Sequence, residues 1–517
     1  MSDSIEAVDK AAVRATLFAH LRGMVLAPVV RALCDRGVFD GGRIATDIRG
    51  NRGYLDVAFH LLGCEGWLNR GASGYELTTD GAAAIRLAAP LYREVVAFIP
   101  MAIFLEDFLT GKSQSGFLPL LQVLVEKARS GWDPTLPAEI RHHLDGMLIG
   151  PTMVAFARNG IFQKLEAGPV EIVDLAGNQS CLSTLFDLLA SRHWIARDGN
   201  LVSFTPEGSY AASIAASYGT TVSYLPMFSV VGTLLFGNPR IPRTDENGVE
   251  LLVNRAINVW GAGGAHKNYY SKIDPIVIEI FSRPLELQPS GICDVGCGDG
   301  SLLEHLYNVI RDQTPRGKAL DKYPLLIVGA DINKVSRRVA KQNLKRAQIP
   351  DHHVIHGDIN RPSLLENDLE LLGVDIHDLL HIRSFLDHNR AWLPPAGYVP
   401  GSRQARTMGA FAHLGQAIPS DELEENLVRH LRRWAPYAGR FGLLMIELHT
   451  LPPEEAAANL VNSPVVAYTG THGFSDQYPV ELPVFVACAK EAGLHADPRL
   501  QATWSTISIN FFSAPQA

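Results

Sequence analysis

Residues 291–306 read GICDVGCGDGSLLEHL, a short apolar run that leads into closely spaced glycines and then into an amphipathic segment. Glycines in this setting, between a strand and a helix, allow a tight turn and a close approach of the backbone to a nucleotide-like ligand. Two further acids stand at expected strand ends, Asp331 closing LLIVGAD and Asp358 in HGDI. The first suits the two ribose hydroxyls and the second an adenine amino group. Together with Asp294 they predict an adenosine-binding site.

Strands and helices alternate from about Ile276 onwards. The apolar runs LLIVGAD, VIHGDI, DIHDLLHIRSFL, FGLLMIEL and TISINFF are separated by amphipathic segments such as SLLEHLYNVI and DELEENLVRHLRRW. Such alternation is typical of a doubly wound α/β domain with a mainly parallel sheet.

The first 215 residues contain an internal repeat. HLRGMVLAPVVRALCDRGVFD, which starts at His20, aligns with HLDGMLIGPTMVAFARNGIFQ, which starts at His143, at an offset of 123 residues. Each copy continues with an apolar helix and a hairpin that ends in a similar signal, YELTTDG or VSFTPEG. Helices followed by a β-hairpin wing predict two winged-helix-like modules.

These modules lack the features of DNA-binding winged helices. Recognition helices present Lys, Arg, Asn or Gln to base edges and phosphates, whereas YLDVAFHLLG and CLSTLFDLLA contain neither Lys nor Arg. We therefore expect the modules to pack, to dimerise and to cover a neighbouring pocket. The predicted domains are 1–120, a first module with a helical extension; 121–250, a second module with a helical linker; and 251–517, the α/β domain.

Composition narrows the class further. The chain has 517 residues, 47% hydrophobic and 19% charged, with a net charge of −8 and no basic stripe, which argues against a nucleic-acid partner. Six cysteines without a C-x-x-C pair fit a reducing cytoplasm. The first residues, MSDSIEAVDK, show no basic patch followed by an apolar run, so we expect no secretory signal. The uncharged stretch 208–239 is interrupted by Pro and Gly and is predicted to be a buried helix, so we expect no membrane partner.

From Ile276 to the C-terminus the chain resembles the class I S-adenosylmethionine-dependent methyltransferases. The resemblance rests on the glycine motif, Asp331, Asp358 and the later segment HIRSFLDHNR, in the expected order. It implies a Rossmann-like seven-stranded methyltransferase domain after a mainly α-helical region with two winged-helix-like repeats. It also implies that Gly296 and Gly298 contact the methionine part of S-adenosylmethionine, Asp331 the ribose, and Asp358 with Ile359 the adenine. Asp294 is a further expected cofactor-binding residue.

A narrower resemblance rests on three runs: SFLDHNR (384–390), LMIELHT (444–450) and THGFSDQYPVE (471–481). They are similar to those of mononuclear-iron C-methyltransferases that act on 2-oxo acids and to polyketide loading-module methyltransferases. A divalent metal chelated by substrate oxygens stabilises an enolate, and iron accepts imidazole and oxygen ligands. The first candidates as metal ligands are His388, His472 and Gln477, although any one His of the 18 is most often a surface or core residue.

Other residues compete for the catalytic role. Glu447 and His449 are two apart on a strand and point to one face, so they could reach a metal or act as acid and base, or form only a structural set. Arg383 or Arg390 could hold a substrate carboxylate, or both could pair with acids such as Asp387. The Gly- and Pro-rich stretch 394–416 is predicted to be an irregular, mobile substrate-binding loop.

The sequence therefore predicts a cytoplasmic C-methyltransferase of specialised metabolism, which could form a homodimer. Its acceptor would be the carbon next to a carbonyl in a small 2-oxo acid or a carrier-bound acyl or malonyl group, methylated with help from iron or another divalent metal. The alternative is a metal-free O- or N-methyltransferase that uses a His base such as His449. A ligand-sensing transcription factor and an inactive adenosine-binding partner protein are the rivals from other classes.

Overall fold

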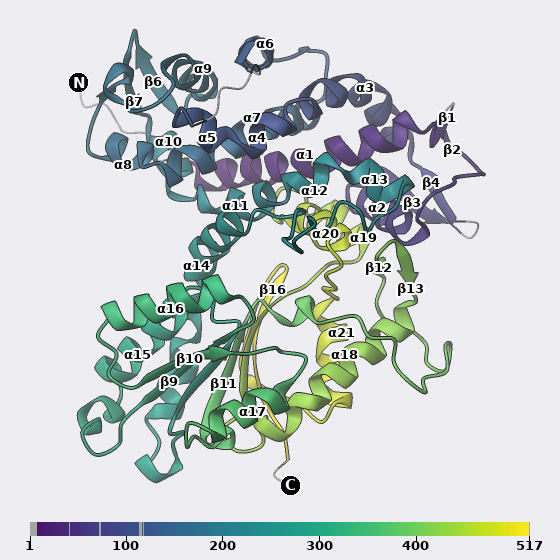
Figure 1. Cartoon of the computed structure of the whole chain (residues 1–517). Helices are drawn as coiled ribbons and strands as arrows, with labels where there is room; N and C mark the ends of the chain where they lie inside the picture. Colours follow the sequence, from purple (N-terminus) through teal and green to yellow (C-terminus); the bar gives the residue numbers. More distant parts are fainter. Residues whose placement is uncertain (1–7, 41, 72–73, 113–115, 117, 516–517) are drawn as a thin grey trace. The chain divides into compact units, whose positions relative to one another are not determined.

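The computed structural model describes residues 8–40, 42–71, 74–112, 116 and 118–515, and the chain divides into two compact units. The N-terminal unit comprises 1–265, 414–417 and 452–475; the C-terminal unit comprises 266–413, 418–451 and 476–517. Helix α14 (Arg255–Phe281) belongs partly to each unit (Figure 1). The predicted boundaries at 120 and 250 stay predictions.

The N-terminal unit is mainly helical, as predicted. Its helices are α1 (Lys10–Asp35), α2 (Arg52–Cys64), α3 (Thr79–Val96), α4 (Ile99–Ile103), α5 (Leu105–Leu109), α6 (Leu118–Arg129), α7 (Ala138–Arg158), α8 (Ile161–Glu166), α9 (Gln179–Ala190), α10 (Pro206–Ser213), α11 (Ala216–Ser223), α12 (Leu225–Ser229), α13 (Val231–Phe236), α19 (Pro453–Ala458) and α20 (Val465–Phe474). Its strands are β1 (Phe39–Asp40), β2 (Arg43–Ile44), β3 (Leu68–Gly71), β4 (Gly74–Leu77), β5 (Val170–Glu171), β6 (Ile195–Asp198) and β7 (Leu201–Phe204).

The two copies of the repeat have matching local structure. Each hairpin, β3–β4 and β6–β7, is followed by a helix whose N-cap is a threonine: Thr78 accepts the N–H of Gly81, and Thr205 accepts the N–H of Gly208. Such caps satisfy a backbone donor that a helix start leaves open. The YELTTDG and VSFTPEG signals therefore mark the same hairpin-to-helix junction twice.

Helices α1 and α7 pack against each other (Figure 1), and their backbones come closest at the glycines of the repeat. A Cβ on Gly23 would lie 2.3 Å from the Cα of His143, and one on Gly146 would lie 2.3 Å from the carbonyl oxygen of His20. Only glycine permits two helix backbones to approach so closely. The paired glycines thus set the central helix crossing of this unit.

The apolar stretch 208–239 differs from the single buried helix that was predicted. It forms most of α10 and all of α11 to α13, with Pro226 in the first turn of α12. Proline lacks the N–H that a continuing helix needs, so the chain restarts rather than extends there. Helix α1, by contrast, has the length and hydropathy of a membrane span, and 83% of that window is buried inside the structure.

The C-terminal unit is built on a seven-stranded sheet. Its strands are β8 (Gly291–Val295), β9 (Leu326–Asp331), β10 (His352–His356), β11 (Leu379–Ser384), β14 (Leu443–Leu448), β15 (His495–Trp504) and β16 (Ile507–Ser513). Its further helices are α15 (Ser301–Gln313), α16 (Lys334–Arg346), α17 (Pro362–Glu370), α18 (Ser420–Trp434) and α21 (Leu482–Glu491). Strands β12 (Phe411–His413) and β13 (Gln416–Ile418) pair separately.

The strand order of the large sheet is β10-β9-β8-β11-β14-β16-β15. All neighbours are parallel except β16, which runs antiparallel to β14 and to β15. The order reverses between β8 and β11, and ligands of such sheets bind at the carboxyl ends of the strands on either side of this reversal. This is the predicted Rossmann-like seven-stranded arrangement.

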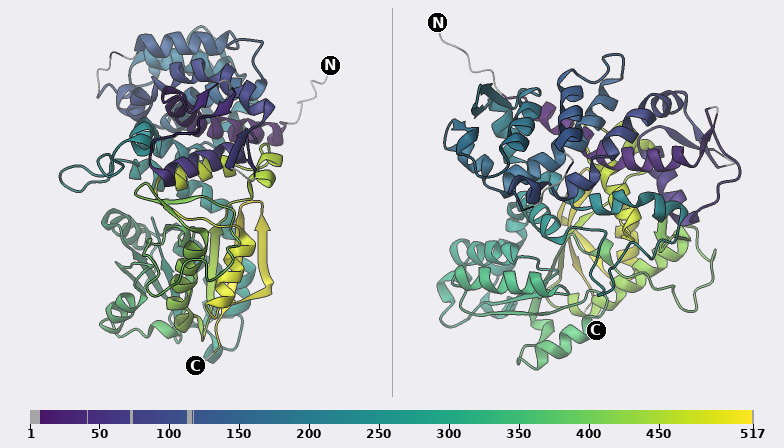
Figure 2. Two further views of the ribbon diagram at one scale, coloured as in Figure 1. Left: turned by 90° about the vertical axis from the view of Figure 1, so that its right-hand side faces the viewer. Right: turned by 45° about the horizontal axis from the view of Figure 1, so that its top comes forward.

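Alternate side chains of the central strands enter different cores, so the sheet is covered on both faces (Figure 2). Ile292 on β8 packs with residues of α14, α15 and α16, whereas Cys293 packs with residues of α17 and with Trp434. A third cluster joins α18 and α21 to β14 and β16. This double cover explains why the strands read as unbroken apolar runs.

Candidate active site

The glycine motif forms the turn between β8 and α15. Gly296 and Gly298 have φ values of 87° and 54°, in the left-handed region that side chains disfavour. The amides of Gly296 and Cys297 both donate to the carbonyl of Ala330 at the end of β9, at 2.7 and 3.1 Å. The turn is thereby fixed against the neighbouring strand.

Asp331 fastens the same turn from the side. Its carboxylate accepts the N–H of Gly298 at 3.1 Å and the N–H of Asn333 at 2.7 Å. The amide of Gly357 donates to the carbonyl of Asp331 at 3.3 Å, which brings the chain after β10 alongside. The next residue, Asp358, accepts both the backbone and the side-chain amide of Asn360 at 2.9 Å.

Asp294 is the buried acid of this group. It is 1% exposed, and its Oδ1 accepts no hydrogen bond within the described part of the chain. Burial, together with the nearby charge of Asp331, raises the pKa of Asp294 to about 8. An unpaired buried carboxyl oxygen is costly, and a cationic ligand would offset that cost.

The predicted cofactor residues are therefore grouped at one sheet edge. Asp294, Gly296 and Gly298 follow or close β8, Asp331 closes β9, and Asp358 with Ile359 follows β10. The carbonyl of buried Ile359 accepts the indole N–H of Trp434 at 2.7 Å. Their roles toward a cofactor stay predictions.

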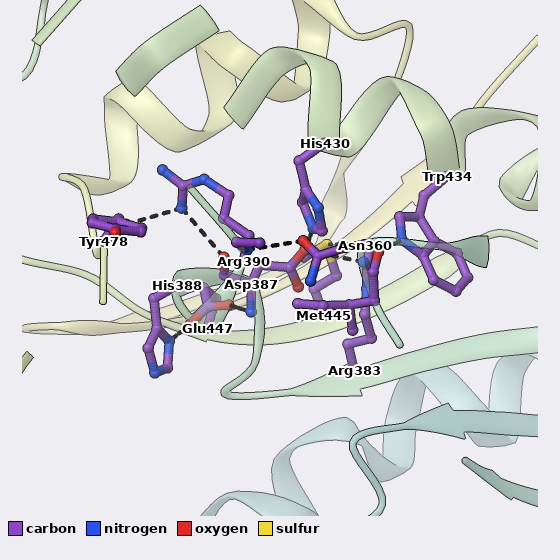
Figure 3. A network of polar contacts seen from close by, with 12 residues as sticks. Asn360, Arg383, Asp387, His388, Arg390, His430, Trp434, Met445, Glu447 and Tyr478 are labelled. Carbon is purple, nitrogen blue, oxygen red and sulfur yellow. Dashed lines mark hydrogen bonds and ion pairs between the residues drawn. The ribbon is translucent and has the colours of Figure 1, made fainter. Parts of the chain in front are cut away.

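A second polar group lies after β11 and at the end of β14 (Figure 3). His388 Nδ1 is 2.6 Å from Oε1 of Glu447, which also accepts the N–H of Leu448 at 2.7 Å. The other carboxylate oxygen of Glu447 accepts the N–H of Asp387 at 2.6 Å. The carboxylate is thus saturated by N–H groups, and it holds one nitrogen of the His388 ring.

The side chain of Asp387 lies at the centre of a buried charge cluster. It pairs with Arg383 at 3.0 Å and with His430 Nε2 at 2.9 Å. Burial alone would raise the pKa of Asp387, but the charge of Arg383 and the hydrogen bond from His430 outweigh it and hold that pKa below its ordinary value. Burial also lowers the pKa of His430 to about 4, so this ring is a neutral donor.

The two arginines of this segment are both held inside the protein. Arg383 lies over the Trp434 ring, 4.6 Å from its centroid, in addition to its ion pair with Asp387. Arg390 donates to Asn426 at 3.0 Å and to the carbonyl of Tyr478 at 3.0 Å. These contacts give both guanidinium groups a structural role, and the predicted catalytic role of Arg383 stays a prediction.

Glu447 and His449, the pair predicted from their spacing, have different partners. His449 Nδ1 is 3.2 Å from the carbonyl of Val480, and Nε2 is 2.7 Å from Ser508 Oγ. Because the carbonyl can only accept, Nδ1 carries the proton and Nε2 accepts from the hydroxyl. Burial lowers the pKa of His449 to about 4. Both ring nitrogens are thus engaged inside the protein.

The predicted metal ligands are spread over two units. His388 and Gln477 belong to the C-terminal unit, whereas His472 belongs to the N-terminal unit. His472 does not follow a strand end, as the sequence suggested; it lies in α20, and its Nδ1 is 2.7 Å from the carbonyl of Tyr468, four residues earlier. The structure holds His388 by a carboxylate and His472 by a helix carbonyl.

Sequence reasoning missed His430 and Asn426, which hold Asp387 and Arg390. A signal for the first existed: Leu423, Leu427 and Trp434 form the buried stripe of α18, and His430 falls on it. A histidine on a core-facing stripe needs a polar partner. Which acid supplies that partner depends on long-range packing.

The predicted loop 394–416 is irregular up to Ala410 and then enters β12. It is tied to helix α18: the N–H of Gly401 donates to Asp421 at 2.6 Å and that of Thr407 to Glu424 at 2.9 Å. Its mobility stays a prediction.

The strand order and directions of the seven-stranded sheet are those of the class I S-adenosylmethionine-dependent methyltransferase fold. Residues 250–510 match the family described as AprA MT2-like domain, and the chain belongs to this family. Residues 145–238 match the AprA winged helix domain and residues 13–70 the AprA N-terminal domain. The predicted winged helix in the second module is thereby confirmed.

A 2-ketoarginine methyltransferase from Streptomyces arginensis is 25% identical over 198 residues, which cover 37% of this chain and 54% of that protein. The chain thus matches about half the length of this curated relative. The family and this relative support a methyltransferase enzyme.

Among solved structures, the chain is similar to human N-acetylserotonin methyltransferase in complex with S-adenosylmethionine. The sequence identity is 14%, the alignment covers 74% of this chain and 99% of that chain, and the TM-score is 0.45. The mitomycin 7-O-methyltransferase MmcR has 13% identity over 72% of this chain and 95% of that chain, with a TM-score of 0.42.

Proposed function

We propose that this methyltransferase uses S-adenosylmethionine to methylate the carbon next to a carbonyl, in a small 2-oxo acid or an acyl or malonyl-type substrate. The observation that carries the proposal is the buried Glu447–His388 pair at the carboxyl ends of β11 and β14. The similarity to a 2-ketoarginine methyltransferase supports a 2-oxo acid as the acceptor class.

The residues at the carboxyl ends of β8, β9 and β10 fit the donor. S-adenosylmethionine supplies an electrophilic methyl group on a sulfonium. The unpaired Oδ1 of Asp294 suits a positively charged ligand, and the left-handed turn at Gly296 and Gly298 permits close approach of its backbone. Asp331 and Asp358 present carboxylates for hydroxyl and amino groups.

His388 is the proposed proton acceptor. A proton on Nδ1 is held by Glu447, so Nε2 carries the lone pair. Asn389 Nδ2 lies 3.1 Å from that Nε2, which agrees with Nε2 being an acceptor. In the reaction the C–H bond breaks and its proton passes to His388 Nε2, while the carbon's electron pair forms the new C–CH3 bond. The S–CH3 bond breaks, and neutral S-adenosylhomocysteine leaves.

A divalent metal, iron among the candidates, fits the chemistry of the predicted ligands. Imidazole and amide oxygen suit such ions, and a metal-bound His usually donates its other nitrogen to a carboxylate, as His388 does to Glu447. In this metal-assisted version, His388 Nε2 would bind the metal together with Gln477 of the same unit and would therefore not accept the proton. The metal would supply Lewis-acid stabilisation of an enolate, and the part of His472 stays a prediction. The support for this is the donor set and the orientation of His388.

The test combines product and metal analysis. Wild-type protein is incubated with labelled S-adenosylmethionine and a panel of 2-oxo acids and malonyl thioesters, beside His388→Ala and His472→Ala, and bound iron, cobalt and manganese are measured without chelator. C-methylation that falls at least about 100-fold in His388→Ala without loss of bound metal supports the base role. Methylation only at oxygen or nitrogen would instead support the alternative activity. Unchanged metal content in both variants would refute metal assistance.

A cytoplasmic location, a homodimer, a carrier-protein partner and the absence of nucleic-acid and membrane partners stay predictions of the sequence.

A further inference from the structure

The N-terminal unit carries the same polar arrangement twice. His20 on α1 and His143 on α7 are equivalent in the repeat, and each lies beside a tyrosine hydroxyl. His20 Nδ1 is 2.8 Å from the Tyr218 oxygen, and His143 Nδ1 is 2.7 Å from the Tyr92 oxygen. The two copies of the repeat therefore share a buried His–Tyr pair. They differ in the side chains that surround the histidine.

The space beside His143 is filled by charged side chains. Arg22 pairs with Glu65 at 3.1 Å and with Glu139 at 2.5 Å, and it donates to the carbonyl of Leu460 at 2.7 Å. Nε2 of His143 lies 3.4 Å from Glu65. The side chains of Glu65, Glu139 and His143 lie close enough together to hold a metal ion. The guanidinium of Arg22, however, already supplies the positive charge that balances the two carboxylates. This copy of the site is closed.

In the second copy the ion pair is reversed and one long side chain is missing. Asp145 stands at the position of Arg22, and its partner is Arg192, which donates to both carboxylate oxygens at 2.7 and 2.8 Å. At the repeat offset of 123 residues from Glu139 stands Thr16. The short threonine leaves a cavity of about 320 Å³, lined among others by Thr16, His20, Trp132, Arg141, Arg192 and Trp194.

His20 lies in the wall of this cavity. The side chain is 1% exposed, and its Nε2 has no hydrogen-bond partner in the described part of the chain. Its equivalent, His143 Nε2, lies 3.4 Å from the carboxylate of Glu65, whereas the cavity wall around His20 holds His142 and Arg192.

The charges and rings of the wall indicate what that partner is. Asp145 is neutralised by Arg192 and also accepts the indole N–H of Trp132 at 2.8 Å. Arg141, whose Nη1 donates to the carbonyl of Leu136 at 2.6 Å, then leaves one net positive charge. Indole rings favour flat apolar groups, and a guanidinium favours a carboxylate. The cavity volume is within the range of small-molecule sites.

We propose that this cavity is a binding site for a small aromatic carboxylate, with its ring against Trp132 and Trp194 and its carboxylate on Arg141. The site lies wholly within the N-terminal unit and does not depend on the methyltransferase reaction. Its ligand would be an effector or a carried metabolite rather than the methyl acceptor.

The test uses benzoate as the probe and the full-length protein, with benzamide and benzylamine as neutral and cationic analogues. Binding is followed by calorimetry and by saturation-transfer NMR, in the presence of saturating S-adenosylhomocysteine. We expect benzoate to bind at least 10-fold more tightly than either analogue. Thr16→Glu, which copies the filled equivalent site, should weaken benzoate at least 10-fold, and Thr16→Ser should change it less than twofold.

Arg141→Met gives a second, independent outcome, because this half-buried side chain lies at the cavity wall. It should weaken benzoate at least 10-fold and leave benzamide unchanged. No benzoate binding by the wild type, or equal binding by wild type, Thr16→Glu and Arg141→Met, would overturn the proposal. Because S-adenosylhomocysteine uptake is measured in the same samples, this outcome is distinct from a failure of the methyltransferase assignment.

Discussion

Glu447 joins the two strands that flank the proposed acceptor site, because its carboxylate receives the ring of His388 and the backbone of Asp387. A carboxylate in this position orients the imidazole and stabilises the cation that forms when Nε2 takes a proton. The residue is buried, so water does not compete for these contacts.

Glu447→Gln keeps the size of the side chain and removes its charge. We expect kcat to fall about 100-fold, within the range that positioned acid–base groups contribute, while S-adenosylmethionine still binds. Glu425→Gln on α18, which loses only a partly exposed pair with Arg429, is the matched control and should retain activity. Steady-state kinetics with calorimetric cofactor binding measures both, and an active Glu447→Gln enzyme would refute the role given to this residue.

Asp294 predicts a pH dependence of cofactor binding. Its pKa in the free protein is about 8, and a positively charged ligand nearby would favour the ionised form. Binding should therefore release a proton below pH 8, and affinity for S-adenosylmethionine should rise as the pH increases from 6 to about 8 and then level off. S-adenosylhomocysteine, which lacks the sulfonium charge, should show a weaker trend.

Calorimetry in buffers of different ionisation enthalpy measures this proton release directly. Asp294→Asn should abolish the pH trend, and an equal trend in wild type and variant would assign it to another group.

The same carboxyl group affects stability without cofactor. A raised pKa in the folded state means that its protonated form stabilises the fold fully below the unfolded-state pKa of 3.8, and that this contribution is lost as the pH rises through about 8. Denaturant unfolding at pH 5 and pH 9 should thus show a smaller decline in stability for Asp294→Asn than for wild type. A steeper decline in the variant would contradict this sign.

At the scale of elements, the crossing of α1 and α7 depends on glycine. The Cβ of Gly23→Ala would lie 2.3 Å from backbone atoms of His143, which cannot move without separating the helices. We expect this variant to lose about 2 kcal/mol or more of unfolding free energy. Gly63→Ala in α2, where the nearest atoms are 3.6 Å away, is the control and should be neutral or stabilising.

Thermal and denaturant unfolding of the two alanine variants provides the comparison. Equal stability of both would show that the close approach at Gly23 does not govern this unit.

Much of the sheet could be predicted because short apolar runs recur along the C-terminal half of the chain and a glycine-rich turn follows the first of them. The gathering of Asp294, Asp331 and Asp358 followed from their positions at strand ends, since parallel strands end at one edge. The pairing of His388 with Glu447 was beyond reach, because it depends on β11 and β14 being neighbours and on their register, Ser384 opposite Ile446. The break of 208–239 into short helices was missed because the composition of this stretch resembles one buried helix.

At the scale of the whole molecule, the chain combines a methyltransferase domain with a helical unit of duplicated design. The duplication was visible in the sequence, but its structural consequence was not: Glu139 pairs with Arg22 in one copy, whereas Thr16 lines a cavity in the other. The place of His472 was not visible in the sequence. This residue lies in α20, which belongs to the N-terminal unit because residues 452–475 rejoin that unit late in the chain.

The most direct measurement for the whole account is 13C NMR of the product formed from S-adenosylmethionine labelled at its methyl carbon and a 2-oxo acid. We predict a labelled methyl group bonded to the carbon next to the carbonyl, formed by the wild type and lost in His388→Ala. A labelled methyl group bonded only to oxygen or nitrogen, or equal C-methylation by His388→Ala, would contradict it.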